Sequence, residues 1–285
     1  MLNRGFIAAS GRNQGARFAR ARNLAGLAVA LAFVPFAFAI QPDVQQIVSR
    51  SIAATQADWQ QLPDFSDIER DADTRGGATT SKTYEVTIID GTPYSRLVAV
   101  DDKALSPAQQ AREAEKLRRA TEKRAGESRS QRARRLAQYQ NGRNRILNLL
   151  RAMASAFNFS IQGEGQLEGH DVYIILATPR PGYVPTSRET RVLTGMRGEL
   201  WIGKGDYKWV KVKAEVVKPV PFGWFLAKVD PGTSFVVEQG AVGQGLWLPE
   251  RLRVKVNATV LFFPKGYIHE ETYRNYHRVS HSSTF

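Results

Sequence analysis

Histidines are the first residues that could do chemistry, and their spacing argues against a metal site. His277 and His281 are four residues apart. On a strand their side chains would point to the same face, but they would lie too far apart to share a metal ion easily. His269 precedes Glu270 and Glu271, but neighbours on a strand point to opposite faces. Solvated strand residues account for these side chains, so we expect no metal ligand here.

Nucleophile and phosphate motifs are also missing from the sequence. No Gly-x-Ser-x-Gly occurs, and Ser282 and Ser283 belong to a predicted frayed tail. Glu270 and Glu271 alternate across a strand, so they would not face one substrate. The glycines from Gly198 to Gly205 separate strands and do not open a helix, which disfavours a phosphate-binding loop. We therefore predict a protein that is not an enzyme, with no catalytic residue and no cofactor; a hydrolase is the remote alternative.

The first 39 residues are predicted to be a secretory signal peptide. They hold five arginines and no acidic residue, then an apolar run from Leu24 to Phe38 that ends in the small-x-small pattern Ala37–Ala39. The run is shorter than the roughly 20 residues of a membrane-spanning helix and contains Pro35. We expect cleavage near Ala39, export to the periplasm, and a soluble mature protein. An uncleaved anchor and an organelle presequence are the alternatives.

We predict that the mature chain is a single domain over residues 40–285. Its cysteine content and its charge limit how it can be stabilised and which partners it can bind. The protein has no cysteine, so a packed core and not disulfides must stabilise it after export. Of its net charge of +13, five charges lie in the leader, and the segment from Arg112 to Arg135 has ten basic and four acidic residues. The basic character is therefore local. Export makes nucleic acid a poor partner, whereas anionic headgroups fit the compartment.

The N-terminal part of the mature chain predicts a helix and then a hairpin. Asp43 is placed to cap an amphipathic helix that ends at Pro63. The polar segment from Asp64 to Ser81 is predicted to be a loop. Alternation from Tyr84 to Val100 around Asp90-Gly91 predicts two strands joined by a tight turn.

A basic helix is predicted as an insertion at about residues 106–140, interrupted near Gly126. Ser106 and Pro107 form a strong helix start, and most of the apolar residues that follow are alanines. The helix should therefore lie on the surface, either as a solvated helix held by Glu–Arg pairs or as an arm that contacts an anionic membrane surface. The residues expected to make that contact are Arg118, Arg119, Lys123, Arg124, Arg132 and Arg135.

A second helix is expected after a break at Asn141-Gly142, where large apolar residues recur from Ile146 to Phe157. It is amphipathic enough to pack on a sheet, with a movable lid as the alternative. The rest of the chain predicts an antiparallel meander. Its clearest strands are Tyr207–Lys218 and Arg251–Phe263, in which apolar residues alternate with polar ones.

The apolar face of this sheet is either a packed core under the helices or a cavity for an acyl chain. Composition does not separate the two alternatives. If the face is a cavity, its wall is expected to include Val210, Val212, Val216, Trp224, Leu226, Leu252, Val254, Val256, Val260 and Phe262.

Three short motifs of the meander resemble the periplasmic lipoprotein-carrier superfamily, especially its outer-membrane lipoprotein-sorting-like bacterial members. They are Gly198–Ile202, Gly245–Pro249 and Tyr273–Tyr276. The resemblance implies an α+β fold, in which a strongly curved antiparallel sheet forms an incomplete β-barrel and helices cover its concave apolar face. It also implies a lipid or lipoprotein as the partner. The basic helix is an insertion by the standards of the well-studied carriers.

The sequence thus predicts an exported, non-catalytic protein of the cell envelope that binds an acyl chain or a lipoprotein. A scaffold, interaction or sensor protein with a packed core and no ligand is the alternative.

Overall fold

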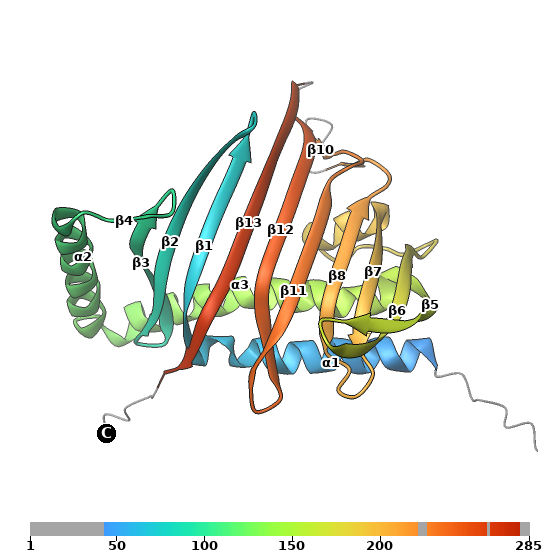
Figure 1. The fold of residues 1–285 in the computed structure, drawn as a ribbon, viewed down its shortest axis with the longest axis horizontal. Helices are drawn as coiled ribbons and strands as arrows, with labels where there is room; N and C mark the ends of the chain where they lie inside the picture. Colours follow the sequence, from blue (N-terminus) through green and yellow to red (C-terminus); the bar gives the residue numbers. More distant parts are fainter. Residues whose placement is uncertain (1–42, 222–226, 261–262, 280–285) are drawn as a thin grey trace, which may run out of the picture. The chain divides into compact units, whose positions relative to one another are not determined.

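Three α-helices and a large sheet make up the part of the chain that the computed structural model describes, which is residues 43–221, 227–260 and 263–279. Figure 1 shows this arrangement. The helices are α1 (Val44–Gln61), α2 (Pro107–Ala125) and α3 (Arg129–Ala156), with 3-10 turns η1 (Leu62–Asp64) and η2 (Glu189–Gly195). The strands are β1 (Phe65–Arg75), β2 (Ala78–Ile89), β3 (Thr92–Val100), β4 (Lys103–Ala104), β5 (Phe157–Leu167), β6 (His170–Pro179), β7 (Met196–Gly203), β8 (Trp209–Val216), β9 (Val220–Pro221), β10 (Ala227–Val229), β11 (Ser234–Gly243), β12 (Leu246–Val260) and β13 (Phe263–Arg278).

The strands form one open, antiparallel sheet that does not close into a barrel. This confirms the predicted α+β fold class with an incomplete barrel. Its order is β4-β3-β2-β1-β13-β12-β11-β8-β7-β6-β5; in addition, β10 pairs with β12, and β9 pairs with β10. The last strand, β13, returns to pair with β1, so the N-terminal hairpin and the C-terminal meander share one sheet. This pairing brings residues about 200 positions apart in sequence into register, such as Asp71 with Glu271.

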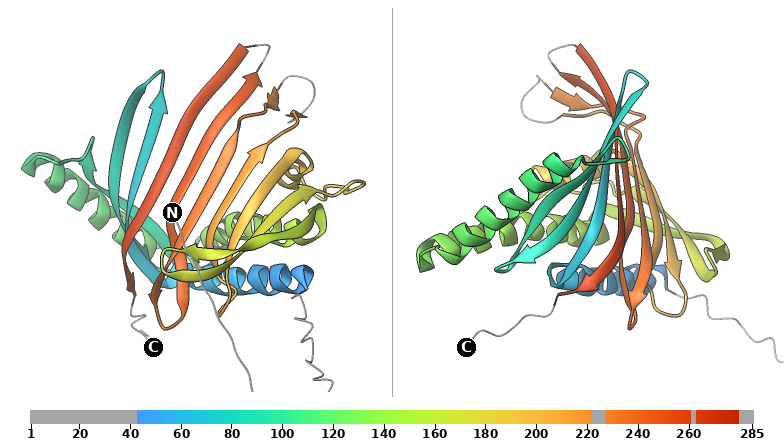
Figure 2. Two further views of the ribbon diagram at one scale, coloured as in Figure 1. Left: turned by 45° about the vertical axis from the view of Figure 1, so that its right-hand side comes forward. Right: turned by 60° about the vertical axis from the view of Figure 1, so that its left-hand side comes forward.

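Helices α1 and α3 run across the strands and cover the apolar face (Figures 1 and 2). The main core cluster joins Ile47, Val48 and Ile52 of α1 with Leu147 and Leu150 of α3, and with apolar side chains of β5 to β8. Burial of each such side chain contributes roughly 1.5–3 kcal/mol. The amphipathic helix after Ile146 therefore packs on the sheet.

Two local predictions are confirmed by backbone geometry. Asp90 and Gly91 both have positive φ, 47° and 80°, in the turn between β2 and β3. Such a two-residue turn matches the twist of the flanking strands. At the start of α2, Ser106 and Gln109 form the reciprocal capping box that satisfies two free backbone N–H groups.

The expected loop from Asp64 to Ser81 is wrong, because residues Phe65–Arg75 form strand β1 and β2 begins at Ala78. Strand β1 lacks a clear apolar alternation, since acidic residues occupy many of its positions. It is held by backbone pairing on both sides, with β2 and with β13. Pairing between neighbours overrides the weak strand propensity of its side chains.

The predicted helix boundaries near residue 140 are also wrong. The interruption expected near Gly126 is found, because α2 ends at Ala125 with Gly126 as its C-cap, but α3 starts at Arg129 and passes through Asn141 and Gly142 to Ala156 without a break. A second capping box, formed by Ser128 and Gln131, fixes the start of α3. The basic residues after 128 therefore belong to the helix that also covers the sheet. Helix α2 lies at the β3 edge (Figure 2).

Residues Pro42–Phe285 cluster as one compact unit, and the predicted signal segment lies outside the described residues. In the described part, no helix combines the length and the apolar character that a membrane span needs.

Candidate functional site

An apolar cavity of about 270 Å³ lies between the sheet and the helices that cover it. Helix α3 contributes Ile146, Leu149, Leu150 and Met153 to its wall, and α1 contributes Trp59. Turn η2 and strands β5, β6, β7, β8, β11 and β12 contribute further lining residues. A cavity with such a lining does not attract water, so it is suited to an apolar group.

Three of the predicted wall residues line this cavity, namely Val212, Val216 and Val254. Val210 does not, because it is the extra residue of a β-bulge where Trp201 pairs with Lys211 and Ile202 pairs with Trp209. The bulge resets the alternation, so Val210 packs in a separate cluster with Val172 and Trp247.

The other predicted wall residues lie elsewhere in the sheet or outside the described residues. Leu252 and Val256 are half-buried on β12, and Val260 is 41% exposed at its end; none of the three lines the cavity. Trp224, Leu226 and Phe262 fall outside the described residues.

Two indole N–H groups in the cavity wall have no hydrogen-bond acceptor within the described residues. They are Nε1 of Trp59 and Nε1 of Trp209, and both atoms are buried. The two rings meet edge to face, with centroids 6.3 Å apart. A buried donor without an acceptor is costly, and neither N–H group exposes surface to the cavity, whose exposed wall is apolar. Sequence reasoning placed Trp209 in the sheet but did not assign it to the wall.

The predicted surface-contact residues fall into two groups. Arg118, Arg119 and Lys123 are exposed on α2, where Glu115 and Glu122 pair with the two arginines.

Three other arginines of this set bind the tip of the β2–β3 hairpin. Arg124 donates to the carbonyl oxygens of Ile89, Thr92 and Pro93. Arg132 and Arg135 pair with Asp90 at 2.6 and 2.7 Å. Their guanidinium groups are therefore already engaged within the protein.

A second cavity, also about 270 Å³, opens between α3 and the β1–β3 end of the sheet. Its wall holds the carboxyl groups of Asp67 and Glu69 and the rings of Tyr139, Tyr273 and Tyr276. Burial raises the pKa of Asp67 to about 6. Burial, and secondarily the neighbouring Asp71, raises the pKa of Glu69 to about 8. Sequence reasoning missed both carboxyl groups because it assigned them to a loop.

His269 faces carboxylates and not solvent alone. Its Nδ1 lies 3.0 Å from Asp73 and its Nε2 lies 2.8 Å from Glu271. These hydrogen bonds raise the pKa of His269, with that to Glu271 the larger cause. Glu270 points away and pairs with Arg251 instead, as the strand alternation predicts.

No protein-family model matches the chain, and no curated protein matches it. Among solved structures, the chain is similar to a DUF1329 family protein from Desulfovibrio piger, with 13% identity, a TM-score of 0.35, and coverage of 84% of this chain and 95% of that one. It is also similar to a putative outer membrane lipoprotein-sorting protein domain from Vibrio parahaemolyticus, with 10% identity, a TM-score of 0.33, and coverage of 83% of this chain and 95% of that one. A third similar structure is a LolA superfamily protein from Nitrosomonas europaea, with 10% identity, a TM-score of 0.30, and coverage of 82% of this chain and 92% of that one. These names agree with the resemblance seen in the sequence, and at such values they carry no conclusion about the ligand.

Proposed function

We propose that the protein is an exported, non-catalytic binding protein of the cell envelope that holds an acyl chain, free or attached to a lipoprotein. The cavity under α3 carries this proposal, because its wall is apolar and it lies where helices meet the sheet. Met153 and the half-exposed Ile146 belong to the covering helix, and a small displacement of α3 would widen the cavity.

The unpaired indole groups favour an acyl ligand over a plain hydrocarbon. Trp209 is only 2% exposed, and its Nε1 lacks an acceptor within the described part of the chain. A displacement of α3 that widens the cavity would also have to uncover this N–H group, and a carboxyl or ester oxygen would then supply its acceptor while the chain fills the apolar space. The ligand class that fits is therefore a fatty acid or an acyl ester.

Native mass spectrometry of the protein purified from its own envelope tests this proposal. We expect bound acyl species and, after delipidation, uptake of a fatty acid. Trp209→Phe should weaken fatty-acid binding more than the binding of an alkane of equal length. Recovery of ligand-free protein alone, together with no uptake of fatty acid or lipopeptide, would contradict the proposal.

The alternative is a scaffold or sensor protein whose apolar face is only a core. The cavity volume favours it, because about 270 Å³ lies just below the range of about 300–1,000 Å³ that is usual for ligand sites. The same experiment separates the two, since a scaffold takes up no acyl ligand. Turnover of esters or glycosides by the purified protein, lost on one polar substitution, would instead favour a hydrolase.

A further inference from the structure

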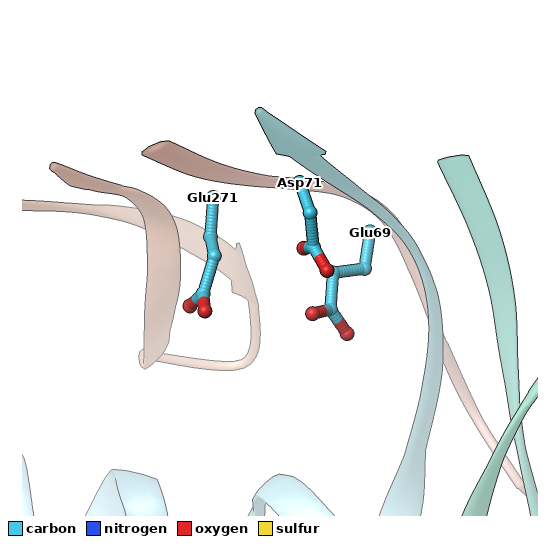
Figure 3. Close-up of side chains that lie close together, drawn as sticks. All are labelled: Glu69, Asp71 and Glu271. Carbon is cyan, nitrogen blue, oxygen red and sulfur yellow. The ribbon is translucent and has the colours of Figure 1, made fainter. Parts of the chain in front are cut away.

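Three carboxylates from paired strands converge beside the second cavity. Glu69 and Asp71 lie on β1 and Glu271 on β13, and one carboxylate oxygen from each lies within 4.8 Å of the others. Register explains the meeting, because Asp71 is the cross-strand partner of Glu271 and Glu69 is the partner of Tyr273. Partners across an antiparallel pair point to the same face. Figure 3 shows the three side chains pointing the same way from their strands.

Protein groups offset little of this negative charge. Glu271 accepts hydrogen bonds from His269 and from the hydroxyl of Tyr273. Oxygen Oδ1 of Asp71 is buried and has no hydrogen-bond partner among the described residues. Lys82, the cross-strand partner of Asp71 on β2, is exposed and takes part in none of the ion pairs found in the described ranges. Within these ranges, no lysine or arginine is therefore paired with any of the three carboxylates, although Lys82 lies on the same face.

Asp67 gives a second and independent indication. It is only 9% exposed, and no hydrogen bond or ion pair to its side chain is found within the described residues. It lines the same cavity as Glu69, and none of the other residues in that wall carries a positive charge. Buried carboxylates normally have a donor or a cation beside them. Asp67 has neither of these among the described residues. Because it lines the cavity, a cation that binds there would offset its charge as well.

We propose that Glu69, Asp71 and Glu271 bind a divalent metal ion of the oxygen-preferring class, such as Ca²⁺, and that Asp67, two residues before Glu69 on the same face of β1, adds negative charge beside it. Carboxylate oxygens suit Ca²⁺, Mg²⁺ and Mn²⁺ and not the softer metals. Ca²⁺ binds oxygens at about 2.3–2.6 Å, so two ligands on opposite sides of it lie about 4.6–5.2 Å apart. The three carboxylate oxygens lie within 4.8 Å of one another, which is close enough for one such ion to contact all of them.

His269 and Tyr273 act here as positioning residues. Each binds a different oxygen of Glu271 through its side chain, which fixes the orientation of that carboxylate. Such partners are typical of metal sites, where they orient a ligand without touching the ion. Water in the cavity would complete the coordination.

Terbium luminescence tests the site on the protein as purified, after treatment with a chelator. Tyr273 touches Glu271, so a Tb³⁺ ion bound there is excited through tyrosine. We expect saturable luminescence that Ca²⁺ displaces, with a Kd of the order of 10⁻⁴–10⁻³ M, as in extracellular calcium modules. Glu69→Gln and Asp71→Asn should each weaken binding at least about tenfold, whereas Glu122→Gln on the exposed face of α2 should leave it unchanged.

Melting of the unmodified protein provides a readout that needs no variant. Millimolar Ca²⁺ should raise the melting temperature relative to chelator, because an ion that binds only the folded state stabilises it. An unchanged melting temperature, or luminescence that persists in both Glu69→Gln and Asp71→Asn, would overturn the proposal. Displacement of Tb³⁺ by ethylammonium but not by Ca²⁺ would also overturn it, in favour of an organic cation. None of these results depends on acyl binding, so this site and the proposed function stand or fall separately.

Discussion

Asp58 is the residue that ties α1 to the strands. Its Oδ2 lies 2.6 Å from Nζ of Lys208 and accepts the backbone N–H of Trp247 at 3.2 Å. The Asp58 side chain is 5% exposed and that of Lys208 is 14% exposed. One carboxylate therefore connects a helix, the segment before β8, and the start of β12.

Replacement of Asp58 by Ala should destabilise the fold strongly. It leaves the Lys208 ammonium in a nearly buried position without its partner, and breaking a buried pair in this way costs about 3–5 kcal/mol. Urea denaturation of the variant measures the change. Glu164→Ala is the matched control, because its pair with Lys204 is half exposed and is worth less than about 1 kcal/mol. Equal losses in the two variants would show that Asp58 contributes no more than a surface residue.

Asp67 and Glu69 predict a pH dependence of stability in metal-free buffer. Both have a raised pKa in the folded state, about 6 and about 8. Below the ordinary carboxyl pKa, both folded and unfolded chains hold these protons, and the contribution to stability is fully present. As the pH rises, the unfolded chain loses the protons first, so stability falls until the pH has passed the folded-state values.

We therefore expect the urea midpoint to decrease between about pH 4 and pH 8 through these two groups. Asp67→Asn and Glu69→Gln should flatten the decrease, whereas Glu122→Gln should not. A double variant Asp67→Asn/Glu69→Gln with the full slope of the parent would show that other groups cause it.

At the scale of elements, the sequence predicted those whose signal is local. The capping box of Ser106 and the Asp90-Gly91 turn depend on residues within a few positions of each other, and both were found. Strand β1 was missed because its pairing with β13 joins residues about 200 positions apart. The carboxylate cluster depends on that pairing, so it could not be predicted either. The bulge at Val210 is a similar case, since only the register with β7 reveals it.

Gly142 is where a helix break was expected and none occurs, and it gives an element-scale prediction. A Cβ built there meets nothing within 4 Å. Since glycine inside a helix costs about 0.5–1 kcal/mol relative to alanine, Gly142→Ala should stabilise the protein by that amount. Gly195→Ala is the contrasting variant, because its Cβ would lie 2.5 Å from Cγ2 of Val220 and 2.6 Å from the Lys218 oxygen. A loss of stability in Gly142→Ala would indicate that α3 is interrupted at this position in solution.

The basic residues of α2 and α3 predict two separable effects. Neutralising Arg118, Arg119 and Lys123 to Gln should weaken binding to anionic vesicles, by up to about 1 kcal/mol per residue, without lowering the melting temperature. Arg135→Gln should lower the melting temperature, because Arg135 is 19% exposed and holds both Asp90 and Glu127.

Vesicle sedimentation at low and high salt, together with thermal melting, distinguishes these effects. Salt should abolish the difference between the parent and the triple variant, since exposed charges are screened beyond about 10 Å at 0.1 M salt. Vesicle binding that is equal in parent and triple variant at low salt would show that α2 is only a solvated helix.

At the scale of the whole molecule, strand alternation indicated a one-sided antiparallel sheet, and the family resemblance indicated that it is curved and covered by helices. The open sheet with α1 and α3 across its apolar face agrees with both. The depth of the cavity could not be predicted, because it depends on how far α3 stands from β8 and β11. Three predicted wall residues line it, yet Trp59 and the α3 residues, which come from the cover, were not assigned to it.

Filling the cavity links stability and binding in one measurement. Ala214 lies on β8 in the cavity wall, opposite Phe235 of β11. A leucine there adds apolar contacts where the parent has empty space, so Ala214→Leu should stabilise the ligand-free protein by about 1 kcal/mol, or roughly 2–4 °C. It should also reduce the rise in melting temperature caused by a fatty acid, because that rise depends on the ratio of ligand concentration to Kd. Ala137→Leu on the exposed side of α3 is the matched control and should change neither quantity. An Ala214→Leu protein that keeps the full fatty-acid shift would place the acyl chain elsewhere, whereas loss of the shift together with a higher melting temperature would locate it between α3 and the sheet.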